Sequence, residues 1–139
     1  MATSERAVSP HRPASARPLS PHLQISRWYL SMALSIAHRI TGIGLVLGLL
    51  FLTWWLVALA GGEAAYVRYQ WWTGNPLGVL VLFGFSIALF FHLCTGIRHL
   101  VWDFGWGYEL HIAKQTGMAV LVATAVLTVL TWLAVLIVA

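Results

Sequence analysis

Residues 77–101 read LGVLVLFGFSIALFFHLCTGIRHLV, an apolar run longer than the roughly 20 residues that a helix needs to cross a bilayer. Residues 40–60 and 118–138 form two further runs of this kind. Of the 139 residues, 60% are hydrophobic and only 9% are charged, too few charges to cover a soluble domain. The sequence therefore predicts an all-α membrane protein with three transmembrane helices.

The first 27 residues differ from the rest, because they are rich in serine, proline and arginine and contain no apolar core. They match neither a secretory signal peptide nor, with Glu5 and several prolines, the amphipathic helix of a mitochondrial transit peptide. We therefore expect an irregular, flexible cytoplasmic arm over residues 1–27. Residues 28–139 would form the three-helix anchor, its first helix beginning near Trp28.

The charges are distributed unevenly about the first apolar run. Five arginines precede or enter it: Arg6, Arg12, Arg17, Arg27 and Arg39. The positive-inside rule places this end in the cytoplasm, with a bacterial inner membrane expected and the mitochondrial inner membrane as the alternative. The net charge of +4 is thus interpreted as a topology signal and not as a nucleic-acid-binding surface.

Helix breakers and aromatic residues agree with these boundaries. Gly61 and Gly62 follow the first run, and Asn75-Pro76 precedes the second, with proline near the first helical position that it favours. Between them, residues 66–72 contain four Tyr and Trp side chains, typical of an aromatic belt at the membrane interface. We expect residues 61–75 to be a loop that carries this belt.

The second run contains ionisable groups that lipid does not tolerate without a partner. His92, His99 and Asp103 fall at helical spacing with three small residues, so that one stripe of the helix contains Gly84, Ala88, His92, Gly96, His99 and Asp103. The small residues either allow close helix packing or leave room for a flat ring. We expect this stripe, together with Arg98, to face a cofactor and a partner subunit.

Neutral imidazole is a common axial ligand of haem iron. His92 and His99 are separated by about 10 Å along one helix, so they cannot both bind one iron. Neither of the other two apolar runs has a histidine in its middle. A second histidine ligand would therefore come from a partner chain.

The stretch that leads into the first apolar run places Ser35 and Arg39 on one helix face, with His38 beside them. Arg39 either extends to the interface as a topology signal or pairs with an anion such as a haem propionate. Ser35, Arg39 and Asp103 would also suit a quinone headgroup. The hydroxyl and the guanidinium would hold carbonyl oxygens, and the carboxylate would supply protons.

Three motifs carry a resemblance to a known family. Residues 17–25 read RPLSPHLQI, residues 35–42 read SIAHRITG, and residues 92–105 read HLCTGIRHLVWDFG. In this order and spacing they resemble the cytochrome b subunits of succinate dehydrogenase, the membrane anchors of respiratory complex II. Ser26 departs from the family, which often has tyrosine there, and this affects only the segment before the first helix.

The resemblance implies a three-helix anchor that pairs with a second anchor subunit and holds one b-type haem between the two. His92 matches the axial ligand of the haem iron. His38 and Arg39 match positions near the haem propionates, and His99 is expected beside the haem edge.

The resemblance also implies a ubiquinone site that includes Ser35 and Arg39, with Asp103 as a candidate proton relay. The flavoprotein and the iron–sulfur subunit would dock on the cytoplasmic face and supply electrons. This chain itself has one cysteine, Cys94, and no dinucleotide-binding glycine motif, so it holds neither an iron–sulfur cluster nor a flavin by any known pattern.

Three alternatives belong to other classes. A haem-free, quinone-binding anchor of the fumarate reductase type would leave His92 without a role. A small transport or channel subunit would need a continuous polar path, which the apolar runs lack. An unrelated two-haem cytochrome would need paired histidines within its own helices.

Overall fold

The computed structural model describes residues 28–138, so the arm expected at residues 1–27, with Ser26, lies outside the described residues. Over residues 28–138 the chain forms four helices: α1 (Leu30–Ala60), α2 (Glu63–Gly74), α3 (Pro76–Asp103) and α4 (Leu110–Val138). In this part of the chain α1, α3 and α4 are each long and apolar enough to cross a membrane. The predicted all-α membrane fold with three long helices is confirmed.

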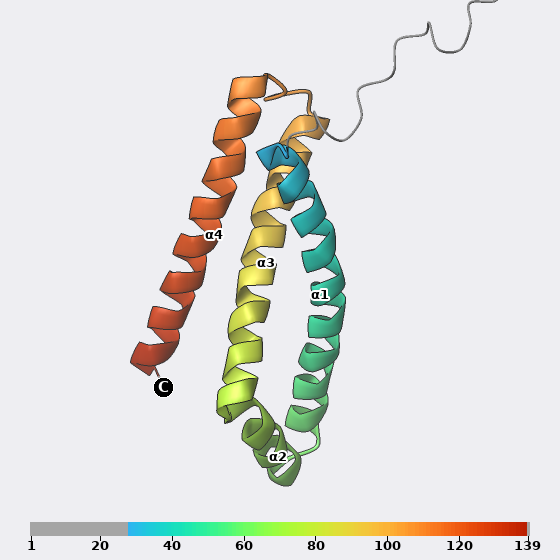
Figure 1. Cartoon of the computed structure of the whole chain (residues 1–139). Helices are drawn as coiled ribbons and strands as arrows, with labels where there is room; N and C mark the ends of the chain where they lie inside the picture. The colour runs from blue at the N-terminus through green and yellow to red at the C-terminus, as the bar shows by residue number, and fades with distance from the viewer. Residues whose placement is uncertain (1–27, 139) are drawn as a thin grey trace, which may run out of the picture.

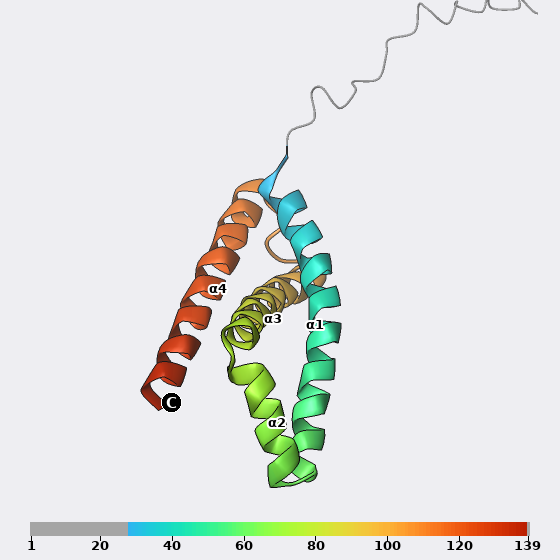
Figure 2. The same ribbon diagram turned by 60° about the horizontal axis from the view of Figure 1, so that its bottom comes forward.

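The three long helices lie side by side, with α3 between α1 and α4 (Figure 1). The view turned by 60° shows α2 under one end of the bundle, where α1 ends and α3 begins (Figure 2). At the other end, α1 begins, α3 ends and α4 begins. We call this second end the N-terminal end of the bundle.

The contact between the long helices is narrow. Leu34, Phe91 and Val120, one from each long helix, form the buried core. Most other large apolar side chains are exposed, as expected for helices whose outer faces meet lipid and not water.

The segment between the first two spans is a helix and not the expected loop. α2 begins after Gly62, whose φ of +86° lies in the left-handed region that glycine tolerates, and it ends before Asn75. Two of its aromatic residues, Trp71 and Trp72, are exposed. Tyr69 instead packs edge-on against Trp54 of α1, with ring centroids 5.0 Å apart.

The junction between α2 and α3 follows the predicted capping pattern. The Asn75 side chain accepts a hydrogen bond from the Gly78 amide at 2.9 Å, and Pro76 occupies the first turn. The amide group of the same side chain donates to the carbonyl of Trp72 at 2.7 Å. Asn75 therefore joins the end of α2 to the start of α3.

Arg98 holds α3 against α4. Its side chain is only 6% exposed, and it donates from Nε to Thr116 Oγ1 at 3.0 Å and from Nη2 to the Ala113 carbonyl at 2.7 Å. Its guanidinium also lies 4.0 Å from the centre of the Trp102 ring. The expectation that Arg98 shares one stripe with the histidines is wrong. Consecutive residues on a helix point about 100° apart, and α4 offers the acceptors.

Candidate functional site

Three histidines from two helices form a stack near the N-terminal end of the bundle. The ring of His38 in α1 lies 3.9 Å from that of His92 in α3, with the two planes 11° apart. On its other side the His38 ring lies 5.2 Å from that of His99, with an angle of 19°. The structure thus brings together His38, His92 and His99, which we call the histidine stack.

Backbone carbonyls determine the proton positions on two of these rings. Nδ1 of His92 lies 3.2 Å from the carbonyl oxygen of His38, and Nδ1 of His99 lies 2.7 Å from that of Thr95. Because a carbonyl oxygen only accepts, Nδ1 carries the proton in both rings. Nε2 is then left with a free lone pair, the form in which imidazole binds a metal.

The third ring is held by a buried hydroxyl. Thr95 Oγ1 donates to the carbonyl of Phe91 at 2.7 Å, so it accepts from Nδ1 of His38, which lies 2.6 Å away. Thr95 is 1% exposed, the most buried side chain in the described part of the chain. All three histidines therefore direct Nδ1 toward the protein.

The stack does not form a site for a bare metal ion. Within residues 28–138, no group of three or more His, Cys, Asp or Glu side chains is arranged to hold one. His38 and His92 lie face to face, so their nitrogens do not converge on one point. A metal bound by His92 would therefore need its other ligands from elsewhere.

The remaining predicted residues lie toward the same end of the bundle. Ser35 is half-buried in α1, Arg39 is exposed one turn later, and Asp103 is the exposed last residue of α3. Among the described residues, no hydrogen bond or ion pair joins any of these three side chains to another. Arg39 and Asp103 are exposed in this chain, and Ser35 is partly exposed.

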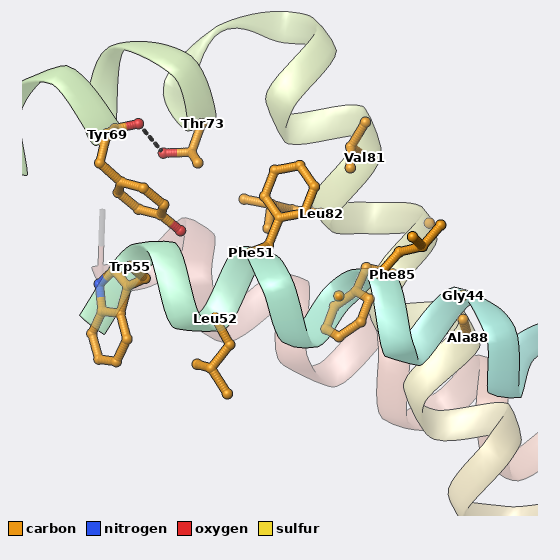
Figure 3. Close-up of a pocket in the computed structure, with 13 residues that line it drawn as sticks. Gly44, Phe51, Leu52, Trp55, Tyr69, Thr73, Val81, Leu82, Phe85 and Ala88 are labelled. Carbon is orange, nitrogen blue, oxygen red and sulfur yellow. Dashed lines mark hydrogen bonds between the residues drawn. The ribbon is translucent and has the colours of Figure 1, made fainter. Parts of the chain in front are cut away.

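An apolar cavity of about 700 Å³ lies between α1, α2 and α3 (Figure 3). It extends from Ala88, one helical turn before His92, to Tyr69 and Thr73 in α2. Nothing lies within 4 Å of where a Cβ would stand on Gly44 or Gly84, so these two glycines leave space in the lining, whereas the Phe85 ring fills the space above Gly48. Burial raises the pKa of Tyr69, and the nearby Tyr66 adds to this, so its phenol stays neutral at the α2 end of the cavity.

The sequence interpretation missed Thr41 and Thr95. Each follows a histidine by three residues, so that His-x-x-Thr occurs on both α1 and α3. Thr41 Oγ1 lies 3.3 Å from Nδ1 of His92, and Thr95 Oγ1 contacts His38. This repeated spacing is the signal that could have identified them.

Comparison with known proteins identifies the family of this chain. Residues 13–131 match the family described as succinate dehydrogenase/fumarate reductase transmembrane subunit. The chain is 44% identical over 115 residues to the succinate dehydrogenase cytochrome b556 subunit of Paracoccus denitrificans, which covers 83% of this chain and 88% of that protein. The corresponding subunit of Rickettsia felis is 40% identical over 116 residues, covering 84% of this chain and 90% of that one.

A mitochondrial relative extends the comparison. The succinate dehydrogenase cytochrome b560 subunit of Sus scrofa is 38% identical over 117 residues, covering 83% of this chain and 69% of that protein. The three long apolar helices agree with a multi-pass membrane protein. From the matched motifs, the fold and these relatives, the chain belongs to the family of succinate dehydrogenase/fumarate reductase transmembrane subunits.

Proposed function

We propose that this chain anchors a succinate dehydrogenase in the membrane, shares a b-type haem with a second anchor subunit and helps to form the site of ubiquinone reduction. The observation that carries the proposal is the bonding of His92. Its Nδ1 is bound to a backbone carbonyl inside an apolar helix bundle, which leaves Nε2 as a ligand for haem iron. The cytochrome b names of the relatives agree with this.

The residues around His92 fit a haem. His92 is only half-buried within this chain, so its open side can meet a partner subunit. The apolar cavity that begins at Ala88 lies one turn away, and a haem needs apolar surroundings for most of its ring. His38 is stacked face to face with His92, so it cannot bind the same iron from the opposite side. A second ligand for the iron would therefore come from the second anchor subunit.

When bound, the haem would supply a one-electron redox centre. His92 would hold the iron, and the ring of His38, itself stacked on His99, would fix the His92 imidazole in one orientation. Arg39, an exposed cation one residue after His38, would pair with a propionate or with the quinone carbonyl.

Ser35 and Arg39 would hold ubiquinone at the N-terminal end of the bundle. The hydroxyl and the guanidinium would donate hydrogen bonds to one carbonyl oxygen and stabilise the negative charge that develops on it during reduction. Asp103, exposed at the end of α3, would relay protons from the aqueous side. The support for this arrangement is that all three residues lie toward one end of the bundle, where Arg39 and Asp103 are exposed and Ser35 is partly exposed.

The partners follow from the family. Succinate oxidation and the first electron transfers take place in a flavoprotein and an iron–sulfur subunit, which dock at the N-terminal end of the bundle. We place this end on the cytoplasmic face of a bacterial inner membrane, as the arginine distribution predicts. The outer faces of α1, α3 and α4 would contact lipid and the second anchor subunit.

A reduced-minus-oxidised spectrum of the purified complex tests the haem assignment. Wild type should show a b-type signal and His92→Ala should lose it. His111→Ala, which changes an exposed histidine outside the stack, should keep it. A full signal in His92→Ala would overturn the ligand assignment. A wild-type complex without haem would instead indicate the haem-free, fumarate reductase-type anchor.

Enzyme assays test the quinone assignment. Arg39→Ala should reduce succinate–ubiquinone activity by about tenfold or more, the effect of losing one charge-stabilising donor, while succinate oxidation by a soluble dye persists. Arg68→Ala, which removes an exposed arginine in α2, serves as the control. Equal loss of both activities in Arg39→Ala would show an assembly defect and not a quinone contact.

A further inference from the structure

The histidine stack is held by two threonines in a reciprocal arrangement. His38 and Thr41 lie on α1, and His92 and Thr95 lie on α3, with the same three-residue spacing. Thr95 Oγ1 is 2.6 Å from Nδ1 of His38, and Thr41 Oγ1 is 3.3 Å from Nδ1 of His92. Each helix therefore holds the imidazole of the other.

Threonines in membrane helices usually bond only to their own backbone, and this chain contains examples. Thr124 and Thr128 of α4 are 7% and 4% exposed, and each donates to the carbonyl four residues earlier at 2.8 Å. Among the described residues, neither hydroxyl has a side-chain partner. Thr95 makes the same backbone bond but is more buried and also binds an imidazole of another helix. Its hydroxyl therefore does more than satisfy the backbone.

These hydrogen bonds hold the His92 ring in one orientation. Because Thr95 fixes the rotation of the His38 ring, His38 can stack on His92 at 3.9 Å with nearly parallel planes. Thr41 and the His38 carbonyl hold Nδ1 of His92 from the other side. Groups that bind the second nitrogen of a ligand histidine set its tautomer and ring orientation.

We infer that Thr95 and Thr41 are positioning residues that lock the His38–His92 pair, so that His92 presents Nε2 in a single orientation. The inference rests on the proposed function, in which His92 binds haem iron. Neither threonine contacts the iron, and both act through the imidazoles.

The test compares variants of the purified complex with nearly unchanged side-chain volume. Thr95→Val removes both the backbone bond and the imidazole bond, Thr124→Val removes only a backbone bond, and Thr95→Ser keeps the hydroxyl. Three readouts are taken: haem content, the low-spin EPR signal of the oxidised haem, which depends on the axial imidazole planes, and carbon monoxide binding to the reduced haem. The last requires an axial ligand to dissociate.

We expect Thr95→Val to retain haem but to shift or split the EPR signal. The fraction of haem that binds carbon monoxide should rise about fivefold, the factor that corresponds to about 1 kcal/mol for one hydrogen bond. Thr95→Ser and Thr124→Val should match wild type. If Thr95→Val fails to assemble, Thr41→Val provides the same test, since its threonine is only partly buried.

Two results would overturn the inference. One is an EPR signal and carbon monoxide reactivity in Thr95→Val equal to those of Thr124→Val. The other is an unchanged signal in Thr41→Val where Thr95→Val cannot be assembled. Neither result affects the haem assignment, which fails separately if His92→Ala retains the full haem spectrum. The double variant Thr95→Val/His38→Ala should give the same EPR signal and carbon monoxide binding as His38→Ala alone, because the threonine acts through His38.

Discussion

Replacing Arg98 by methionine tests whether the buried arginine joins α4 to α3. Arg98 is the one side chain of α3 that donates two hydrogen bonds to α4 among the described residues, and methionine has a similar length without a charge or a donor. Thr116 keeps its bond to the Ile112 carbonyl at 2.9 Å, so the change leaves no orphaned hydroxyl. The lost interactions are therefore well defined.

The magnitude follows from those contacts. Each interhelical hydrogen bond in a membrane protein contributes about 1 kcal/mol, and the desolvated cation–π contact with Trp102 about 1 kcal/mol more. Methionine recovers part of this, because it removes the cost of burying a charge. We expect a net loss of about 2 kcal/mol in the free energy of unfolding.

Unfolding of the purified chain in bicelles by titration with a denaturing detergent measures this difference. Arg98→Lys should lose about half as much, because an ammonium keeps the charge but cannot reproduce the fork of donors. The pair Arg98→Met and Thr116→Val should be non-additive, since the two side chains share one hydrogen bond. A change below about 0.5 kcal/mol in Arg98→Met, a typical value for surface substitutions, would refute the role of Arg98 as the link between α3 and α4.

Three further predictions concern the packing of α1 on α3, the start of α3 and the helix α2. Gly48→Ala should destabilise the fold by about 1–3 kcal/mol, because the Phe85 ring occupies the space of the added methyl group. Gly44→Ala is the control, since its methyl group would meet nothing within 4 Å. Thermal unfolding of both variants measures the difference. Asn75→Ala should cost about 1 kcal/mol in the same assay by removing the cap of α3. Asn75→Asp should keep the acceptor of this cap but lose the donor to the Trp72 carbonyl, so its stability should lie between those of wild type and Asn75→Ala. Burial raises the pKa of the Tyr69 phenol above its ordinary value of 10.0. The stability that the neutral phenol contributes is therefore complete below pH 10 and is lost as the pH rises through the folded-state pKa. Tyr69→Phe should flatten this alkaline decline when the free energy of unfolding is measured against pH.

The sequence alone was sufficient for the membrane class, the three long helices and the start of α3. In lipid every backbone group must be bonded within the chain, so a long apolar run is a helix whatever surrounds it. The Asn75-Pro76 cap could be predicted for a similar reason, since its partners lie within three residues. The place of His92 within the second span also followed from the local sequence, because the residue lies well inside one apolar run.

Contacts between helices could not be predicted in this way. Whether Arg98 turns toward α4 or toward a cofactor depends on the rotation of α3 in the bundle, and only packing sets that rotation. α2 escaped prediction because its 12 residues are too short for a span and have no buried face that would give a periodic pattern.

The histidine stack shows most clearly what the sequence determines and what only the tertiary structure determines. The sequence identified His38, His92 and His99 as candidates through their ionisable rings in or near apolar runs. In the structure His38 stacks between the other two rings, Thr95 holds His38, and Thr41 holds His92. Each of these contacts joins residues more than 50 positions apart. Local sequence determines which segments become helices, because hydropathy and backbone bonding act within one segment. The register between two helices depends on side-chain packing across their interface, and therefore only the tertiary structure decided which imidazole each threonine holds.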